Sequence, residues 1–500
     1  MTDDKGASRR EALSLAAMLP AAILAGGIAP SAAAQTPQAE PKPAGPVTPA
    51  LAAYIAGSGT AKFPEEHRDL ARLHILDTLA SIVACRDLEP ALLARKYALA
   101  QSGTESRNAA TILGTKDKAS LSDAIFASAM TGHGAEINDF IPSAFVQPGP
   151  SIVSAAIGLA ERRGLSGDAI VRAVIVGYEL AGRVPKAIGN ANLREAGIAN
   201  HGLGPVFGTA AASASMIGIK QDRISDLLTY CAQQASGSWQ WLMDVEHIEK
   251  SFVFAGMGAR NGLQAALMVE AGFRGVRDSF DNPEGWLRAG AFAKGDANPA
   301  YLIEKLGERT ELNETAFKRY PVGGPTQPAV HGLLQLLPKI DRAKVDGVRI
   351  EMPGRWQAFR DAAMPALNLR YTSSLILIDG KLDFVSAQSL QRMASDTKVK
   401  AMMERVTVVH DPAQEAAAGQ PRTESARVIV TETGGRKQEI FVPYVVGFPS
   451  HPMSRADVEA KATELMGPAL GASRARQVVE RVRSMDSLKK GGELVGLIAT

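Results

Sequence analysis

The feature that most constrains the fold of this chain is a long run of helical periodicity. From about Pro49 to Ala271, apolar residues recur at the spacing of one helix face. Small residues are dense here, as in AAASAS and AGMGARNG, and they allow helices to approach one another closely. Strand-like runs are scarce. The periodic segments are 69–84, 121–130, 152–162, 167–184 and 224–235.

The pattern changes after about Glu311. Alternation of apolar and polar residues predicts strands, and Gly434-Gly435 indicates a hairpin between the last two of them. Helical spacing returns near the C-terminus. The predicted strands are 345–353, 405–410, 426–432 and 438–442; the predicted helices are 326–337, 373–378, 385–394, 455–466 and 474–498.

We therefore predict a mainly α protein with a smaller α+β lid domain. The all-helical domain is expected to be discontinuous, comprising 49–310 and 445–500, because the C-terminal helices should pack back onto it. The lid domain is expected at 311–444.

The N-terminus predicts export. Basic residues (Lys5, Arg9, Arg10) precede an apolar stretch that ends in small residues at 31–34. This is the pattern of a twin-arginine (Tat) signal peptide over 1–34, and an uncleaved anchor is the alternative. The Pro-rich segment 35–48 reads as a linker. We expect a periplasmic protein that uses the Tat machinery and has no membrane contact after cleavage.

Charge and cysteine content limit the partners. Segment 1–34 holds three basic and three acidic residues, so the remaining chain keeps the net charge of +3. No Lys/Arg block suggests nucleic acid, and the balance suits an anionic small substrate only weakly. Cys85 and Cys231 lie in apolar helical patterns, which predicts buried free thiols. A long-range disulfide between them is the alternative.

The standard catalytic motifs are absent. The chain has no P-loop, nucleophile elbow or H-E-x-x-H, no glycine cluster follows a predicted strand in the way that a dinucleotide-binding fingerprint requires, and its eight histidines lack metal-ligand spacing. We therefore expect acid–base catalysis without a cofactor or metal.

Four clusters could carry such chemistry. The first is Glu136, Asn138 and Asp139, followed by Gln147, on an irregular segment between two helical patterns; a solvated loop with a capping Asp is the alternative. The second is His201 at the start of a Gly-rich helix, where a capping or core histidine is the alternative.

The third cluster is Glu246-His247 with Glu249-Lys250, which could equally be a charged surface turn. The fourth is Lys318-Arg319-Tyr320 before a Gly-Gly-Pro turn that opens a helix. Lysine, arginine and helix N-terminal amides together can bind a carboxylate, and a plain surface loop is the alternative.

At these clusters the chain resembles the MmgE/PrpD family, which includes 2-methylcitrate dehydratase, cis-aconitate decarboxylase and iminodisuccinate epimerase. The resemblance extends from about 49 to 490. It is strongest in HGAEINDF (133–140), QPGPSIVSAA (147–156), NHGLGPVFGTAAA (200–212), EKSFVFAGMGARNG (249–262) and AFKRYPVGGPTQP (316–328).

The resemblance implies an all-α domain with an α+β lid, a homodimer and a metal-independent site between the domains. Glu136 and Asp139 match the acidic loop of the family, and His201 matches its helix-start histidine. Lys250 and Lys318 match two of its lysines.

The chain departs from the family pattern at three positions. Gln147-Pro148 stands where the characterised dehydratases and decarboxylases carry His-Pro, Val322-Gly323-Gly324 stands where another His is frequent, and Phe140 replaces a Thr. An amide cannot shuttle protons as imidazole does, so at least one acid–base role has moved or been lost.

We predict a lyase or isomerase for a small di- or tricarboxylic acid, closest in type to a carbon–oxygen lyase such as 2-methylcitrate dehydratase. His201 is expected to move the proton α to a carboxylate with help from Asp139. Lys318 is expected to hold a substrate carboxylate and to stabilise an enolate-like intermediate, and Lys250 to neutralise a second carboxylate or to protonate the leaving group. Glu136, Gln147, Arg319 and Tyr320 are expected to bind substrate. A periplasmic carboxylate-binding protein on the same scaffold, and a hydrolase, are the alternatives.

Overall fold

A computed structural model describes residues 46–102, 109–290, 292–295, 297–417 and 424–500. The predicted signal peptide and residues 35–45 of the linker lie outside this part of the chain. The last two residues of the predicted linker already belong to the first helix, which begins at Val47. In the described ranges, no helix combines the length and the apolar character that a bilayer span requires.

The first half of the chain is helical, as its periodicity predicts. Two short strands, β1 (Ala109–Thr111) and β2 (Lys118–Ser120), form the one hairpin described there. The helices of this part are α1 (Val47–Gly57), α2 (Glu65–Cys85), α3 (Glu89–Gln101), α4 (Leu121–Gly132), α5 (Gly149–Arg163), α6 (Gly167–Ile188), α7 (Asn190–Glu195), α8 (Asn200–Ile217), α9 (Ile224–Gln234), α10 (Ile248–Ser251) and α11 (Met257–Glu270).

Glycines let α6 and α8 approach at backbone distance. A Cβ placed on Gly177 would lie 3.1 Å from the carbonyl oxygen of Gly208, and one on Gly208 would lie 2.7 Å from that of Gly177. Both helices are buried along most of their length. This close packing fixes the first turn of α8, which carries His201, deep inside the helical part.

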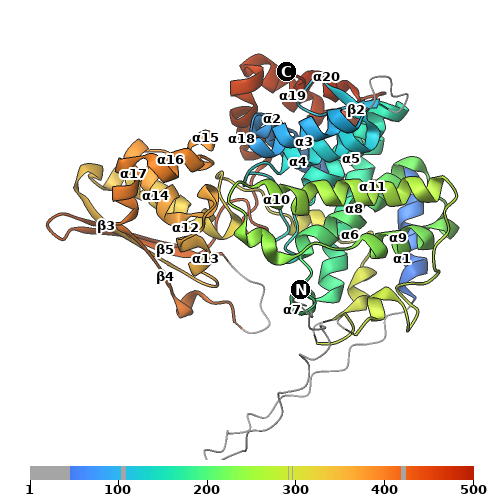
Figure 1. Cartoon of the computed structure of the whole chain (residues 1–500), viewed down its shortest axis with the longest axis horizontal. Coiled ribbons are helices and arrows are strands. Elements are labelled where there is room, and N and C mark those ends of the chain that lie inside the picture. The colour runs from blue at the N-terminus through green and yellow to red at the C-terminus, as the bar shows by residue number, and fades with distance from the viewer. Residues whose placement is uncertain (1–45, 103–108, 291, 296, 418–423) are drawn as a thin grey trace, which may run out of the picture. The chain divides into compact units, whose positions relative to one another are not determined.

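A four-stranded sheet forms the core of the second part (Figure 1). The strand order is β4-β3-β5-β6; β3 runs parallel to β4 and antiparallel to β5, and β5 and β6 form the predicted hairpin. Gly434 and Gly435 supply the positive φ angles of 95° and 85° that this turn needs. The strands are β3 (Val345–Met352), β4 (Val406–His410), β5 (Ala426–Glu432) and β6 (Lys437–Val442).

Helices cover one face of this sheet. Apolar residues of α12 and α14 join the inward-facing valines of β3 and β5 in one core. The predicted helix 385–394 is broken into two short ones, since Ser389 caps the second with its side chain. The helices here are α12 (Gln327–Leu336), α13 (Gln357–Arg360), α14 (Leu369–Asp379), α15 (Phe384–Ala387), α16 (Leu390–Ser395) and α17 (Thr397–Met403).

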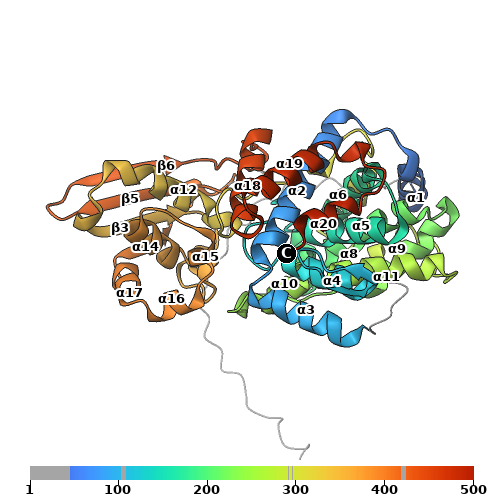
Figure 2. The same ribbon diagram turned by 90° about the horizontal axis from the view of Figure 1, so that it is seen from above.

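The C-terminal helices return to the first half of the chain. They are α18 (Arg455–Leu470), α19 (Ala472–Arg483) and α20 (Glu493–Ile498). Ala462, Met466 and Val478 share a buried cluster with Ile75 of α2. Figures 1 and 2 both show α18 beside α2. Residues almost 400 positions apart are thereby joined, as Lys461 and Asp77 show with a separation of 384.

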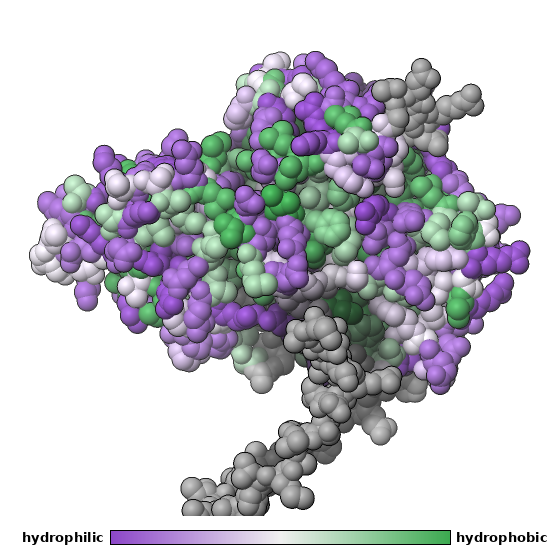
Figure 3. Space-filling view, in the orientation of Figure 1, coloured by the Kyte–Doolittle hydropathy of each residue, from purple (hydrophilic) through white to green (hydrophobic). Residues whose placement is uncertain are grey.

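Figure 3 shows hydrophobic side chains gathered near the middle of one face, around α3 and α10. Leu92 and Tyr97 of α3 are exposed, and so are Leu242 and Met243 on the 3-10 turn that precedes α10. The homodimer that the resemblance implies stays a prediction. Both cysteines are buried free thiols.

Candidate active site

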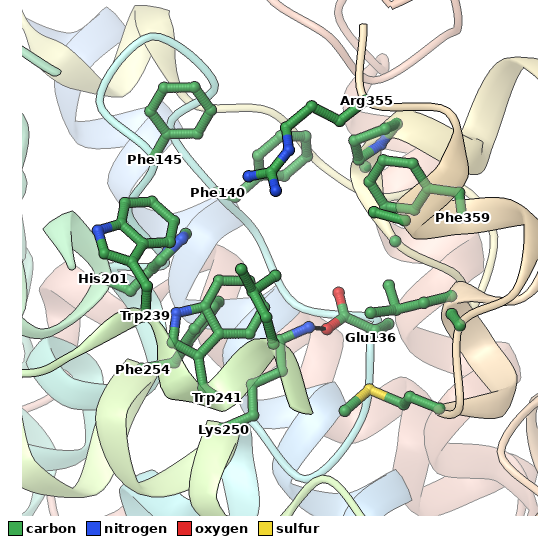
Figure 4. A pocket seen from close by; sticks show the side chains of 18 of the residues that line it. Glu136, Phe140, Phe145, His201, Trp239, Trp241, Lys250, Phe254, Arg355 and Phe359 are labelled. Carbon is green, nitrogen blue, oxygen red and sulfur yellow. Dashed lines mark hydrogen bonds and ion pairs between the residues drawn. The ribbon is translucent and has the colours of Figure 1, made fainter. Parts of the chain in front are cut away.

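A cavity of about 770 Å³ is lined by residues of the helical part and of the sheet-containing part (Figure 4). Five of the eight residues predicted to form the site line it: Glu136, Gln147, His201, Lys250 and Lys318. They come from four parts of the sequence, since Glu136 and Gln147 both lie on the segment between α4 and α5.

Helix α18 contacts the acidic segment between α4 and α5 through Lys461. The Lys461 ammonium donates to the Asp77 carboxylate at 2.6 Å and to the carbonyl oxygen of Ile137 at 2.8 Å, and both hydrogen bonds are buried. Burial lowers the pKa of the Lys461 ammonium against the opposing effect of Asp77. The irregular backbone next to Glu136 is therefore fixed by tertiary contacts rather than by a regular element.

A backbone bridge then ties this segment to the chain that carries Lys318. Phe140 N–H donates to the carbonyl of Ala316 at 3.0 Å, and Ala316 N–H donates back at 2.7 Å. The Phe140 ring also fills the space beside Gly324, where a Cβ would lie 2.9 Å from it. These contacts bring Lys318 within reach of Glu136.

Glu136 stands between two buried lysines. Its carboxylate accepts from Lys250 Nζ, and Lys318 Nζ lies 3.1 Å from its other oxygen. The side chains of Glu136 and Lys250 are each 3 % exposed, and that of Lys318 is 1 % exposed. These charges therefore interact in a medium far less polar than water. Burial by itself raises the pKa of Glu136, but the two ammonium groups outweigh it and hold the pKa well below its usual range.

Lys318 has no hydrogen-bond partner among the described residues, despite its ion pair with Glu136. A buried ammonium group with unused donors on a cavity wall is poised to bind an anion. Lys250 Nζ, by contrast, donates a hydrogen bond to the Glu136 carboxylate. Burial lowers the pKa of Lys250, and Glu136 opposes that shift.

His201 is held as a neutral imidazole. Its Nδ1 lies 2.9 Å from Oε1 of Gln147, and its ring stacks on Phe254 with centroids 3.9 Å apart. Burial first, and Lys250 second, lower the pKa of His201 well below the usual value. Because the amide oxygen can only accept, Nδ1 carries the proton and Nε2 keeps a lone pair, the form that a base requires.

A short π-helical turn, Phe252–Gly256, places the lysine and the aromatic support together. Lys250 lies one turn before Phe254, and its Nζ is 5.1 Å from the Phe254 ring centroid. Such turns inside α-helices are frequent at functional sites. Nothing in the amino-acid pattern of 249–262 marks it.

His133, Glu136 and His247 form the one described group that could hold a metal ion, with ligand atoms within 4.8 Å of one another. His247 Nε2 lies 3.2 Å from Glu136, and His133 Nε2 has no hydrogen-bond partner among the described residues. The same carboxylate, however, already balances two ammonium groups, which would repel a further cation. The residues present therefore fit an anion better than a metal.

The structure corrects the role expected of Asp139. It does not line the cavity and makes no described contact with His201. Its carboxylate is fully buried. Oδ2 of Asp139 lies 2.9 Å from Nδ1 of His74 and accepts a hydrogen bond from the hydroxyl of Tyr178 at 2.5 Å. Burial and the nearby Asp139 raise the pKa of Tyr178 well above its usual value. Asp139 thus anchors the loop, and Gln147 is the residue that orients the imidazole.

The substrate contacts expected of Arg319 and Tyr320 are also not supported by their positions. Arg319 is exposed, and the Tyr320 hydroxyl pairs with His331 Nδ1 at 2.8 Å; neither lines the cavity. Successive residues on an irregular segment point in different directions, and here only Lys318 faces inward.

Several cavity residues were not singled out from the sequence. Arg355 reaches into the cavity from the sheet-containing part, as Figure 4 shows, and no described residue pairs with it. Trp239, Trp241 and Phe359 form much of the remaining wall. The aromatic repeat in SWQWL was the one available signal, and nothing in the PGRW run pointed to Arg355.

The fold and the cavity define a mainly helical protein with a buried, positively charged site suited to acid–base chemistry. The chain belongs to the MmgE/PrpD family: residues 49–297 match the MmgE/PrpD N-terminal domain and residues 320–486 match the MmgE/PrpD C-terminal domain. This confirms the resemblance drawn from the motifs.

Two fungal relatives are similar over much of the chain. A cis-aconitate decarboxylase-like protein, oryM, of Aspergillus oryzae is 26% identical over 368 residues, which are 67% of this chain and 72% of that protein. A cis-aconitate decarboxylase of Aspergillus terreus is 26% identical over 314 residues, which are 59% of this chain and 60% of the relative.

Proposed function

We propose that this protein is a lyase that acts on a small carboxylic acid by acid–base chemistry. The observation that carries the proposal is the charge balance around Glu136. Two buried ammonium groups face one buried carboxylate, and the pKa values of His201 and His247 are lowered, which favours their neutral forms. One positive charge is left over, and uncompensated buried charge is costly, so an anionic ligand is expected there.

Three other described carboxylates line the cavity, those of Asp244, Asp361 and Glu424, while the ion pair described for Lys318 is with Glu136. Asp244 is only partly buried, and its two oxygens accept from the backbone N–H groups of Lys250 and Glu246 at 2.8 and 3.0 Å. A substrate carboxylate would bind Lys318 through its unused donors, and a second carboxylate would meet Arg355. A diacid fits this pair of cations.

The proposed chemistry begins at His201. Its Nε2 takes the proton from the carbon α to the substrate carboxylate, and the electron pair moves into that carboxylate, whose added charge Lys318 stabilises. Loss of a β-substituent with its bonding electrons then forms a double bond, and Lys250 gives a proton to the leaving oxygen. In a decarboxylation, the C–C bond to the leaving carboxylate breaks instead of a C–H bond, carbon dioxide leaves without the bonding pair, and that pair takes a proton from the Lys250 ammonium, which solvent then protonates again.

The names of the fungal relatives support turnover over simple capture, and a decarboxylase or dehydratase over a hydrolase. Lysine lowers the energy of the carbanion by placing fixed charge where charge develops, which requires no metal or cofactor in this scheme. The carbon–oxygen lyase reaction predicted from the sequence remains one form of this proposal.

Proton NMR in D₂O with a panel of di- and tricarboxylic acids tests the proposal on the full chain. Wild-type protein should incorporate deuterium at the α-carbon and form an unsaturated or decarboxylated product. His201→Asn should abolish both, while His331→Asn, which alters a histidine outside the cavity, should retain them. Full exchange and turnover by His201→Asn would remove His201 from the reaction.

A further inference from the structure

The cavity is much more apolar than a site for a compact polyacid requires. Its volume of about 770 Å³ lies in the upper part of the range for pockets that hold drug-sized ligands. In Figure 4 the labelled charged groups, those of Glu136, Lys250 and Arg355, lie among aromatic rings. The apolar wall consists of Phe140, Phe145, Trp239, Trp241, Leu242, Phe254, Phe359, Met364 and Leu367.

The tryptophan side of this wall is rigid. Trp239 Nε1 donates to the carbonyl oxygen of Ile198 at 3.1 Å, and the guanidinium of Arg194 lies 4.3 Å from its ring centroid. Trp241 meets Phe254 edge-on at 4.8 Å and is only 8 % exposed. Both rings are thus fixed before any ligand arrives, so little conformational entropy is lost when an apolar group packs on them.

The opposite side is also apolar. Phe359 lies across the cavity from the tryptophans in Figure 4, next to the segment that carries Arg355. A substrate with carboxylates at every end would press charged groups against these rings without hydrogen-bond partners, which is unfavourable. An aromatic or alkyl substituent would instead replace water at surfaces that the protein leaves uncovered.

We propose that the substrate carries a bulky apolar substituent, an aromatic ring or an alkyl chain of several carbons, in addition to its carboxylates. Lys318 and Arg355 bind the acid groups, and Trp239, Trp241 and Phe359 bind the substituent. This inference rests on the proposed function, because it assumes that the acid groups occupy the cationic centre.

Calorimetric titration of the full-length protein with a matched pair of probes, succinate and 2-benzylsuccinate, tests the inference. Burial of a ring of this size predicts an affinity for 2-benzylsuccinate roughly 10- to 100-fold higher than for succinate. Trp239→Ala should bring the ratio of the two affinities to within about threefold of one, whereas Phe441→Ala, on an exposed residue of β6, should leave the ratio unchanged. Phe359→Ala provides a second test from the other wall.

The outcomes separate this inference from the proposed function. Equal affinities for the two probes, or tighter binding of succinate, would overturn the apolar subsite and leave the carboxylate site standing. Tighter binding of 2-benzylsuccinate whose ratio neither Trp239→Ala nor Phe359→Ala reduces would overturn the assignment to these walls. Failure of both probes to bind at millimolar concentration would overturn the carboxylate site itself, and the proposed function with it.

Discussion

Replacing Glu136 by glutamine should destabilise the protein far more than its single lost charge would at the surface. The change preserves the shape of the side chain but leaves Lys250 and Lys318 without their counter-charge. Their side chains are 3 % and 1 % exposed, so water cannot take the place of the carboxylate. Breaking a buried ion pair by removing one partner costs about 3–5 kcal/mol.

A surface pair supplies the matched control. Glu270 binds Arg163 through both oxygens at 2.7 Å, but its side chain is 38 % exposed. An exposed pair of this kind contributes about 0–1 kcal/mol, so Glu270→Gln should cost several-fold less than Glu136→Gln. The difference between the two variants isolates the effect of burial.

The pH dependence gives a second signature. Because the pKa of Glu136 is lowered in the folded state, its stabilising effect is present above the unfolded carboxyl pKa of about 4.3 and is lost as the pH falls below it. Glu136→Gln should lack this acid-dependent loss. In this variant Lys250 loses the carboxylate that opposes the lowering of its pKa by burial, so the stability should rise with pH toward the unfolded lysine pKa of about 10.4.

Thermal and urea unfolding of both variants and the wild type, from acid to mildly alkaline pH, measures these effects. The double variant Glu136→Gln/Lys250→Met should regain part of the lost stability, because one buried charge is then removed. If Glu136→Gln is no less stable than Glu270→Gln at neutral pH, the three charges are not as buried as the structure indicates, and the charge-balance argument fails.

Three further predictions concern the groups around the site. The pKa of His201 is lowered, so kcat/KM should stay level as the pH falls through about 6.5 and decline only below that value; a decline centred above 6.5 would contradict the neutral imidazole. Gln147→Leu should lower kcat by roughly 5- to 150-fold, and by more than it changes KM, because Nδ1 of His201 loses its acceptor. Gln147→Glu should restore part of the rate. Unchanged kinetics in Gln147→Leu would remove the orienting role of Gln147. Lys461→Met should cost about 3–5 kcal/mol of unfolding free energy by leaving Asp77 unpaired, and Lys461→Met with Asp77→Leu should recover much of it; a stable single variant would show that α18 does not anchor the loop.

Glu136 and Asp139 show where sequence reasoning about the site stopped. Both lie on the same short acidic segment, and both looked suitable for catalysis. The segment has no helical or strand period, so nothing local sets the direction of either side chain. The contacts of Ile137 with α18 and of Phe140 with Ala316 turn Glu136 toward the cavity and Asp139 toward Tyr178.

The sequence by itself determined the elements and the chemical groups. The period of the hydrophobic pattern predicted the strands, including β5 at Ala426–Glu432 and its hairpin to β6, because that period is imposed by local backbone geometry. It also predicted most of the helices, but it missed the breaks in 385–394 and in 474–498, where α19 ends at Arg483 and α20 begins at Glu493. The motifs identified the family and five of the cavity residues. Only the tertiary structure decided that Gln147 pairs with His201 across 54 residues, that Lys318 faces inward while Arg319 faces solvent, and that Arg355 and two tryptophans complete the wall. Those outcomes depend on contacts between distant segments, and no local pattern records which segments will meet.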